Sequence, residues 1–194
     1  MLVPQGDLAS LALQYLTDKG PQSHNYVRDY EPLFAPLRDK QLTLLEIGVL
    51  NGASIQMWSD YFPNGKIVGV DKDLKQFTWR PNVLLLQANV STGEILQQVA
   101  EHAGPLDIVI DDGSHNHGDH MIALFELMQF LEPDGMYFIE DLHGDHITKQ
   151  YLKLLQASPE QATMYHANSD AYRVLDVQLL YEENLALIRW GKVL

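Results

Sequence analysis

The chain has 194 residues without a single cysteine, and its 26 acidic and 13 basic residues give a formal net charge of −13. This length fits one domain with one core, and the charge disfavours nucleic acid or an anionic membrane surface as a partner because both would repel it. Without cysteine, a bound metal must be held by carboxylates, histidines or carbonyl oxygens, which favours a hard ion such as Mg²⁺ or Mn²⁺.

No low-complexity tract or Pro/Ser-rich linker divides the sequence, so we expect a single domain over residues 1–194. The chain has no stretch of about eighteen apolar residues and no basic-then-apolar order at its start, which predicts a cytoplasmic protein. Apolar residues from Leu8 to Leu16 recur at three-and-four spacing and predict an amphipathic helix that ends near Gly20. Residues 1–40 are therefore interpreted as an N-terminal helix and a lid-like segment.

Five short apolar runs alternate with helical patterns in the middle of the chain. The runs cover residues 43–47, 67–71, 83–86, 106–111 and 136–140. Because they are apolar on both sides and separated by helices, they predict a buried parallel sheet. The fold class is therefore α/β, with a Rossmann-like doubly wound sheet of five parallel strands.

Two further apolar segments follow near the C-terminus, over residues 174–181 and 185–190. The link between them, residues 182–184, is too short for a parallel crossover. We therefore predict an antiparallel hairpin that closes the sheet. The segment 145–171 is interpreted as a helix and a substrate-facing loop.

The segment Leu44–Ser54 has the order expected of a strand, a tight turn and a helix. The strand ends in Glu46, the turn contains Gly48 and Gly52, and Ser54 lies near the start of the helix. Glycines let the backbone come close to a ligand. Asp71 ends the next strand about twenty residues further on, where an acid can accept hydrogen bonds from ribose hydroxyls. The pattern predicts a nucleoside site; an ordinary turn with a solvated aspartate is the alternative.

Acidic residues follow two later strands, in the runs Asp111-Asp112-Gly113-Ser114-His115 and Glu140-Asp141. The carboxyl ends of neighbouring strands meet at one edge of the sheet, so Asp112, Glu140 and Asp141 would lie in one crevice. Three carboxylates repel one another unless a cation lies among them. A divalent ion there would lower the pKa of a substrate hydroxyl, with His115 as general base. Alternatively, Asp112 caps a helix that begins near Asn116.

Four runs carry a family resemblance: TDKGPQSHNY, LLEIGVLNGAS, DDGSH and IEDLH. From about Thr17 to His143 the chain resembles class I S-adenosylmethionine-dependent methyltransferases, and in particular the metal-dependent sugar O-methyltransferases of the macrocin and mycinamicin type. The resemblance implies S-adenosylmethionine and Mg²⁺ or Mn²⁺ as cofactors. The implied cofactor-binding residues are Glu46, Gly48, Gly52, Ser54, Asp71, Asn89 and Asp111; the implied metal ligands are Asp112, Glu140 and Asp141; the implied catalytic base is His115.

The resemblance further implies O-methylation of a small-molecule hydroxyl, on a sugar or another natural-product intermediate, and a homo-oligomer. Larger family members carry an additional N-terminal domain, which leaves the acceptor open. By the same analogy His24, Tyr26 and Tyr30 would fold over the donor as a lid, although tyrosines at this spacing also pack on a helix face. Trp58, which follows the glycine turn at helical spacing, is expected in the core.

Three other functions are compatible with parts of this pattern. A metal-dependent hydrolase would use the acids and His115 to activate water, but leaves Gly48, Gly52 and Asp71 without a role. A non-catalytic nucleoside- or effector-binding module would keep only the glycine turn. A nicotinamide oxidoreductase is disfavoured because the glycine spacing is not G-x-G-x-x-G. Binding of S-adenosylmethionine and the effect of metal removal would separate these functions.

Overall fold

The computed structural model describes residues 7–75, 80–158, 162–166 and 171–193. Its helices are α1 (Leu8–Tyr15), α2 (Val27–Phe34), α3 (Ala53–Tyr61), α4 (Gly93–Ala103), α5 (His117–Leu127) and α6 (His146–Ala157). Its strands are β1 (Thr43–Ile47), β2 (Lys66–Asp71), β3 (Val83–Gln87), β4 (Leu106–Asp111), β5 (Leu131–Ile139), β6 (Thr163–His166), β7 (Ala171–Leu180) and β8 (Leu185–Val193). Within these ranges no helix combines the length and the apolar character needed to cross a bilayer.

The strands form one mixed sheet in the order β3-β2-β1-β4-β5-β8-β7-β6. Strands β1 to β5 pair in parallel, and β8 pairs antiparallel with β5 and β7. This confirms the predicted five parallel strands and closing hairpin. Strand β6 adds a third antiparallel strand beside β7, in the segment that we expected to form a helix and a loop; the residues between β6 and β7 lie outside the described ranges.

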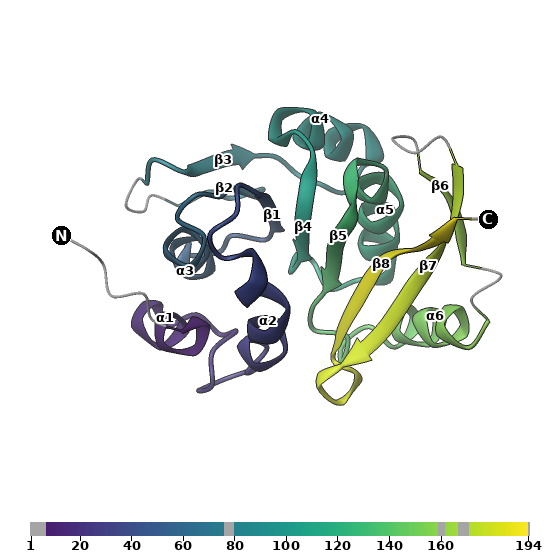
Figure 1. Ribbon diagram of the computed structural model, residues 1–194, viewed down its shortest axis with the longest axis horizontal. Helices are drawn as coiled ribbons and strands as arrows, with labels where there is room; N and C mark the ends of the chain where they lie inside the picture. Colours follow the sequence, from purple (N-terminus) through teal and green to yellow (C-terminus); the bar gives the residue numbers. More distant parts are fainter. Residues whose placement is uncertain (1–6, 76–79, 159–161, 167–170, 194) are drawn as a thin grey trace.

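Both faces of the sheet are covered by helices, as Figure 1 shows. Leu44 of β1 packs into the core beneath α1, α2 and α3, whereas Leu45 and Ile47 pack into the core beneath α4, α5 and α6. This alternation follows from the two-residue period of a strand. Because β1 lies between β2 and β4, the order in which successive strands are added to the sheet reverses beside it, and a crevice opens at the carboxyl ends of β1 and β4.

Aromatic side chains fill the core between α2, α3 and the sheet. Trp58 is fully buried, which confirms its expected place in the core, and its neighbours Tyr61 and Phe62 are fully buried too. Tyr30 stacks on Phe34 with ring centroids 5.1 Å apart. Helices α1 to α3 are thus joined to the sheet by a rigid aromatic layer, which fixes the N-terminal segment beside the crevice.

Candidate active site

The turn after β1 requires glycine at two positions. Gly48 has a φ of +87°, and a Cβ there would lie 2.0 Å from the carbonyl oxygen of Asp112. Gly52 has a φ of +77° and precedes the first residue of α3. The backbone of the turn therefore lies directly against the end of β4, where no side chain fits between them.

Glu46 and Ser54 support this turn from inside. Both are buried, and the Ser54 hydroxyl donates a hydrogen bond of 2.8 Å to Glu46 Oε2. Burial raises the pKa of Glu46 to about 7, although the positive charge of Lys19 opposes this rise. The two residues connect β1 to α3.

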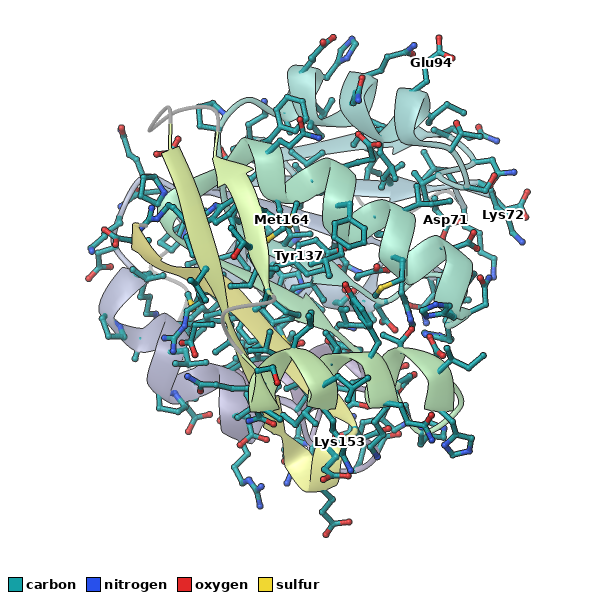
Figure 2. The ribbon with its side chains drawn as sticks, turned by 90° about the vertical axis from the view of Figure 1, so that its right-hand side faces the viewer. Asp71, Lys72, Glu94, Tyr137, Lys153 and Met164 are labelled. Carbon is teal, nitrogen blue, oxygen red and sulfur yellow. The ribbon has the colours of Figure 1, made fainter. Side chains whose placement is uncertain are left out.

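Asp71, at the end of β2, fixes the same turn from outside. Its Oδ2 accepts hydrogen bonds from the N–H groups of Val49 at 2.8 Å and Leu50 at 3.0 Å, and its Oδ1 accepts one from Asp73 at 2.9 Å. Partial burial opposes ionisation, but these backbone hydrogen bonds hold the pKa of Asp71 below its usual value. Figure 2 shows Asp71 beside Lys72 at one edge of the molecule.

A cavity of about 570 Å³ lies against this turn, and we call it the glycine-turn cavity. Its volume is in the range that holds a cofactor-sized ligand. Its lining includes four of the predicted cofactor residues, Gly48, Asp71, Asn89 and Asp111, together with Ser114 and Asp119. Glu46, Gly52 and Ser54 do not line it. They therefore shape the turn rather than face a ligand in this cavity.

Asp111 is the buried acid of the glycine-turn cavity, with an exposed fraction of 3%. Burial raises its pKa to about 6, although a hydrogen bond of 3.1 Å from the Tyr137 hydroxyl to Asp111 Oδ2 opposes this. Figure 2 places Tyr137 in the interior of the molecule. Sequence analysis did not identify Tyr137, because its position within the apolar run of β5 resembles that of any core residue.

Asp112 faces the other side of the β4 end and meets two of the predicted residues. His115 Nε2 lies 3.9 Å from Asp112 Oδ1 and 3.8 Å from Asp141 Oδ2. One ligand atom from each of these three residues lies within 4.8 Å of the others, an arrangement that could hold a metal ion. His115 and Asp141 both have a positive φ, 56° and 57°, which is uncommon for residues other than glycine and is often found at functional sites.

Glu140 lies differently from the expected set of three open carboxylates. It is buried, its Oε2 accepts a hydrogen bond of 2.7 Å from Lys19 Nζ, and its Oε1 accepts one from the Tyr30 hydroxyl. Its oxygens therefore point toward the N-terminal segment, while Asp112 and Asp141 face His115. The physical reason is the buried ammonium of Lys19, which attracts the carboxylate.

Lys19 is the main site residue that sequence analysis missed. Its exposed fraction is 1%, and its Nζ also contacts Asp112 Oδ2 at 2.5 Å and Glu46 Oε1 at 3.3 Å. Burial favours the neutral amine, but the three carboxylates outweigh it and raise the pKa of Lys19 well above its usual value. A lysine so deeply buried is rare. Only its place in the run TDKGPQSHNY hinted at a role.

Asp141 is held by residues from both ends of the chain. The Tyr26 hydroxyl donates a hydrogen bond of 2.6 Å to Asp141 Oδ1, and His24 Nδ1 lies 3.3 Å from the same oxygen. Asn184, which follows the turn between β7 and β8, donates a hydrogen bond of 2.6 Å from its Nδ2 to the Tyr26 hydroxyl oxygen. Its Oδ1 accepts a hydrogen bond of 2.5 Å from the His143 N–H. Asn184 thus links the closing hairpin to the acidic residues, a contact that no sequence pattern indicated.

The three residues expected to form a lid over the donor, His24, Tyr26 and Tyr30, lie beside the acids instead. Tyr26 and Tyr30 are fully buried and bond to Asp141 and Glu140, and neither they nor His24 line the glycine-turn cavity. The aromatic hydroxyls are drawn to the carboxylates, where they satisfy buried oxygens.

The capping alternative for Asp112 is wrong. The N-cap of α5 is Asn116, whose Oδ1 accepts a hydrogen bond of 3.1 Å from the Asp119 N–H. Further along this helix lies a buried pair, in which His120 Nδ1 is 2.9 Å from Asp145 Oδ2. The pair connects α5 with the start of α6. Asp112 is thereby free to contact Lys19 and His115.

Three comparisons with known proteins bear on this site. A rhamnosyl tetracenomycin-C 2'-O-methyltransferase from Streptomyces olivaceus is 41% identical over 146 residues, which cover 72% of this chain and 38% of that protein. The mycinamicin VI 2''-O-methyltransferase of Micromonospora griseorubida is 34% identical over 143 residues, covering 70% of this chain and 36% of the relative. The chain therefore spans less than half the length of these curated relatives.

Among solved structures, the MycE methyltransferase of mycinamycin biosynthesis, in complex with Mg, SAH and mycinamycin VI, superposes with a TM-score of 0.82 and 29% identity. The match covers 97% of this chain and 56% of MycE. This confirms the predicted fold and the resemblance to mycinamicin-type enzymes. Residues 29–171 also match the family model for FtsJ-like methyltransferases. With the glycine turn, the cavity beside it and this match over most of its length, the chain belongs to the FtsJ-like methyltransferase family.

Proposed function

We propose that this chain catalyses transfer of a methyl group from S-adenosylmethionine to a hydroxyl of a small molecule, with the help of a divalent metal ion. The observation that carries this proposal is the divergence of two adjacent residues at the end of β4. Asp111 lines the glycine-turn cavity, whereas Asp112 lies with His115 and Asp141. A donor in the cavity and an acceptor beside the acids would therefore be neighbours, as transfer between them requires.

The glycine-turn cavity is the proposed donor site. Its volume of about 570 Å³ and its mixed lining suit a nucleoside with a charged amino-acid part. Asp71 is the proposed partner of the ribose, and Asn89 that of the adenine. Asp111 is proposed to face the positively charged part of the donor. The MycE structure with SAH supports this assignment by its similarity to this chain.

Asp112 and Asp141 are the proposed metal ligands, and Glu140 is proposed as a third. Their oxygens are the ligand type that Mg²⁺ prefers, and Asp112 and Asp141 already converge on His115. A bound divalent ion would supply charge that lowers the pKa of a coordinated hydroxyl. His115, whose Nε2 faces both aspartates, is proposed to accept the hydroxyl proton during transfer.

The proposed acceptor class is a sugar hydroxyl of a natural product. Both curated relatives described above are named as O-methyltransferases, one of them for a rhamnosyl compound, and the MycE structure is a complex with mycinamycin VI. The matches cover less than half of these relatives, and the proposed acceptor rests both on this similarity and on the ability of a divalent cation to bind hydroxyl oxygens. A cytoplasmic location and self-association complete the proposal.

Titration calorimetry with S-adenosylmethionine, and separately with NADH, tests the donor with and without Mg²⁺. We expect micromolar binding of S-adenosylmethionine in both metal conditions and none of NADH. Absence of S-adenosylmethionine binding in both conditions would contradict the methyltransferase proposal and favour a hydrolase built on the acids and His115.

Metal removal then separates catalysis from simple binding. We expect a chelator to abolish methyl transfer to a glycosylated acceptor while leaving S-adenosylmethionine binding largely intact. A non-catalytic module would bind the donor with no metal-dependent product. Turnover that persists after chelation would contradict the metal requirement but not the proposed methyl transfer.

A further inference from the structure

The buried ammonium of Lys19 lies among three carboxyl groups. Its three contacts go to carboxylates on three strand ends: Glu46 of β1, Asp112 after β4 and Glu140 after β5. The ammonium donates hydrogen bonds to Asp112 and Glu140, and it forms an ion pair of 3.3 Å with Glu46 Oε1. The Lys19 ammonium therefore takes the place of a cation bound at this edge of the sheet, but it is covalently attached to the chain.

The charges in this cluster do not balance. One ammonium faces three carboxyl groups, and the further carboxylate of Asp141 lies beside them, so negative charge exceeds positive charge even where burial keeps Glu46 partly protonated. Buried carboxylates are costly without compensating positive charge. The excess attracts a divalent cation, but the same two acids that would bind it, Asp112 and Glu140, already hold Lys19.

We propose that Lys19 is an internal counter-ion that competes with the divalent metal for Asp112 and Glu140. This inference rests on the proposed metal-dependent function. Lys19 Nζ occupies Asp112 Oδ2 and Glu140 Oε2, and Tyr30 occupies Glu140 Oε1. A cation that takes Glu140 as a ligand must share or displace these contacts, and it is repelled by the nearby ammonium in either case.

The backbone of Lys19 explains why the competitor stays in place. It lies in the segment between α1 and α2, where the Lys19 carbonyl accepts a hydrogen bond of 3.1 Å from the Val27 N–H. The side chain thus enters the cluster from a fixed point. Lys19 offsets part of the charge of the acids before a metal arrives, and sets how tightly the metal binds.

Binding of Mn²⁺ alone, measured by electron paramagnetic resonance, tests this inference on the 194-residue chain. The variant Lys19→Met removes the charge and keeps much of the volume. We expect it to bind Mn²⁺ at least about tenfold more tightly than wild type, since a unit charge and a divalent charge a few ångströms apart repel by more than that factor even at the dielectric constant of water. Equal or weaker binding would overturn the proposal and make Lys19 a support for the metal site.

Tyr30→Phe is the matched control. It removes the other hydrogen bond to Glu140 without changing charge, so we expect its Mn²⁺ affinity to stay within about threefold of wild type. An increase equal to that of Lys19→Met would show that release of Glu140 matters rather than the charge of Lys19, and would overturn the proposal.

Lys19→Met leaves buried carboxylates without a cation and can fail to fold without metal. Lys19→Gln, which is neutral but donates hydrogen bonds, serves as the second variant. If neither folds without metal, recovery of the fold in millimolar Mn²⁺ supports interchangeable cations, and failure of Mn²⁺ to restore either variant overturns it. Asp112→Asn tests the metal site itself: if wild type binds no Mn²⁺, or if this variant binds as well as wild type, the proposed metal centre fails first.

Discussion

At the scale of single residues, the end of β4 shows how one step along a strand divides two roles. Asp111 points into the glycine-turn cavity beside the Tyr137 hydroxyl, and Asp112 points toward Lys19 and His115. Successive side chains of a strand point to opposite sides, so two adjacent acids reach two different sites. The sequence predicts roles for both acids, because they lie at the end of a buried strand.

Asp111 makes stability depend on pH. Burial gives it a pKa of about 6 in the fold, against 3.8 for the ordinary side chain. Its protonated form stabilises the fold fully below a pH of about 4, and this contribution is lost as the pH rises through about 6. The amide of Asp111→Asn does not titrate in this pH range, so the variant lacks this pH-dependent contribution. We therefore expect the stability of the variant relative to wild type to increase by roughly 3 kcal/mol between about pH 4 and pH 7.

Urea unfolding of the ligand-free protein over this pH range measures the difference. The subtraction of wild type from variant isolates Asp111 from the other titrating groups. A difference that does not change with pH would show that Asp111 titrates normally in the fold.

His115 is expected to matter for turnover rather than for donor binding. His115→Asn removes the base and still tolerates the left-handed backbone at this position, where φ is 56°. We expect methyl transfer to fall by about 10²- to 10⁴-fold with little change in the dissociation constant of S-adenosylmethionine. His102→Ala, on the exposed surface of α4, is the control. Wild-type turnover in the His115 variant would remove it as the base.

At the scale of elements, the strand-turn-helix unit of β1 and α3 depends on close backbone contact. Gly48 and Gly104 have nearly equal positive φ values, 87° and 86°. A Cβ at Gly48 would collide with the Asp112 carbonyl at 2.0 Å, while a Cβ at Gly104 would meet no atom within 4 Å. The two positions therefore separate backbone strain from steric collision.

We expect Gly104→Ala to lower the free energy of unfolding by about 1–3 kcal/mol, the usual cost of such a backbone. Gly48→Ala should cost more than about 4 kcal/mol, because the collision adds to the strain, and should also weaken S-adenosylmethionine binding. Chemical denaturation measures both. Equal losses would mean that the turn can move away from β4.

The elements themselves were predictable to different degrees. The five parallel strands could be recognised because each is a local apolar run. The early start of β5 at Leu131 was missed because Pro133, Asp134 and Gly135 resemble a turn. Strand β6 is defined by its pairing with β7, which no local pattern reveals. Lys19 was missed for the same reason: its burial depends on acids about thirty to one hundred and twenty residues away.

At the scale of the whole molecule, the net charge of −13 is expected to disfavour binding of polyanions such as nucleic acids. Nucleic-acid binding depends on basic residues that replace condensed counterions. We expect no retention of single- or double-stranded RNA at about 100 μM protein and about 0.15 M salt, and no gain when the salt is lowered. Filter binding measures this. Retention that strengthens as salt falls would reveal a basic surface that the net charge conceals.

The two halves of the site also differ in how far apart their residues lie in the chain. The glycine-turn cavity is built from residues 47–123, whereas the acidic side joins Lys19 to Glu140 and joins Tyr26 to Asp141 and to Asn184 in the closing hairpin. Contacts between distant segments form late because closing long loops costs entropy. We expect pulsed hydrogen exchange during refolding to protect the amides of β1, β2 and β4 before those of β8. A newly made chain would then form the proposed donor pocket before the proposed metal ligands are in place, and the proposed reaction would wait for the last hairpin to dock.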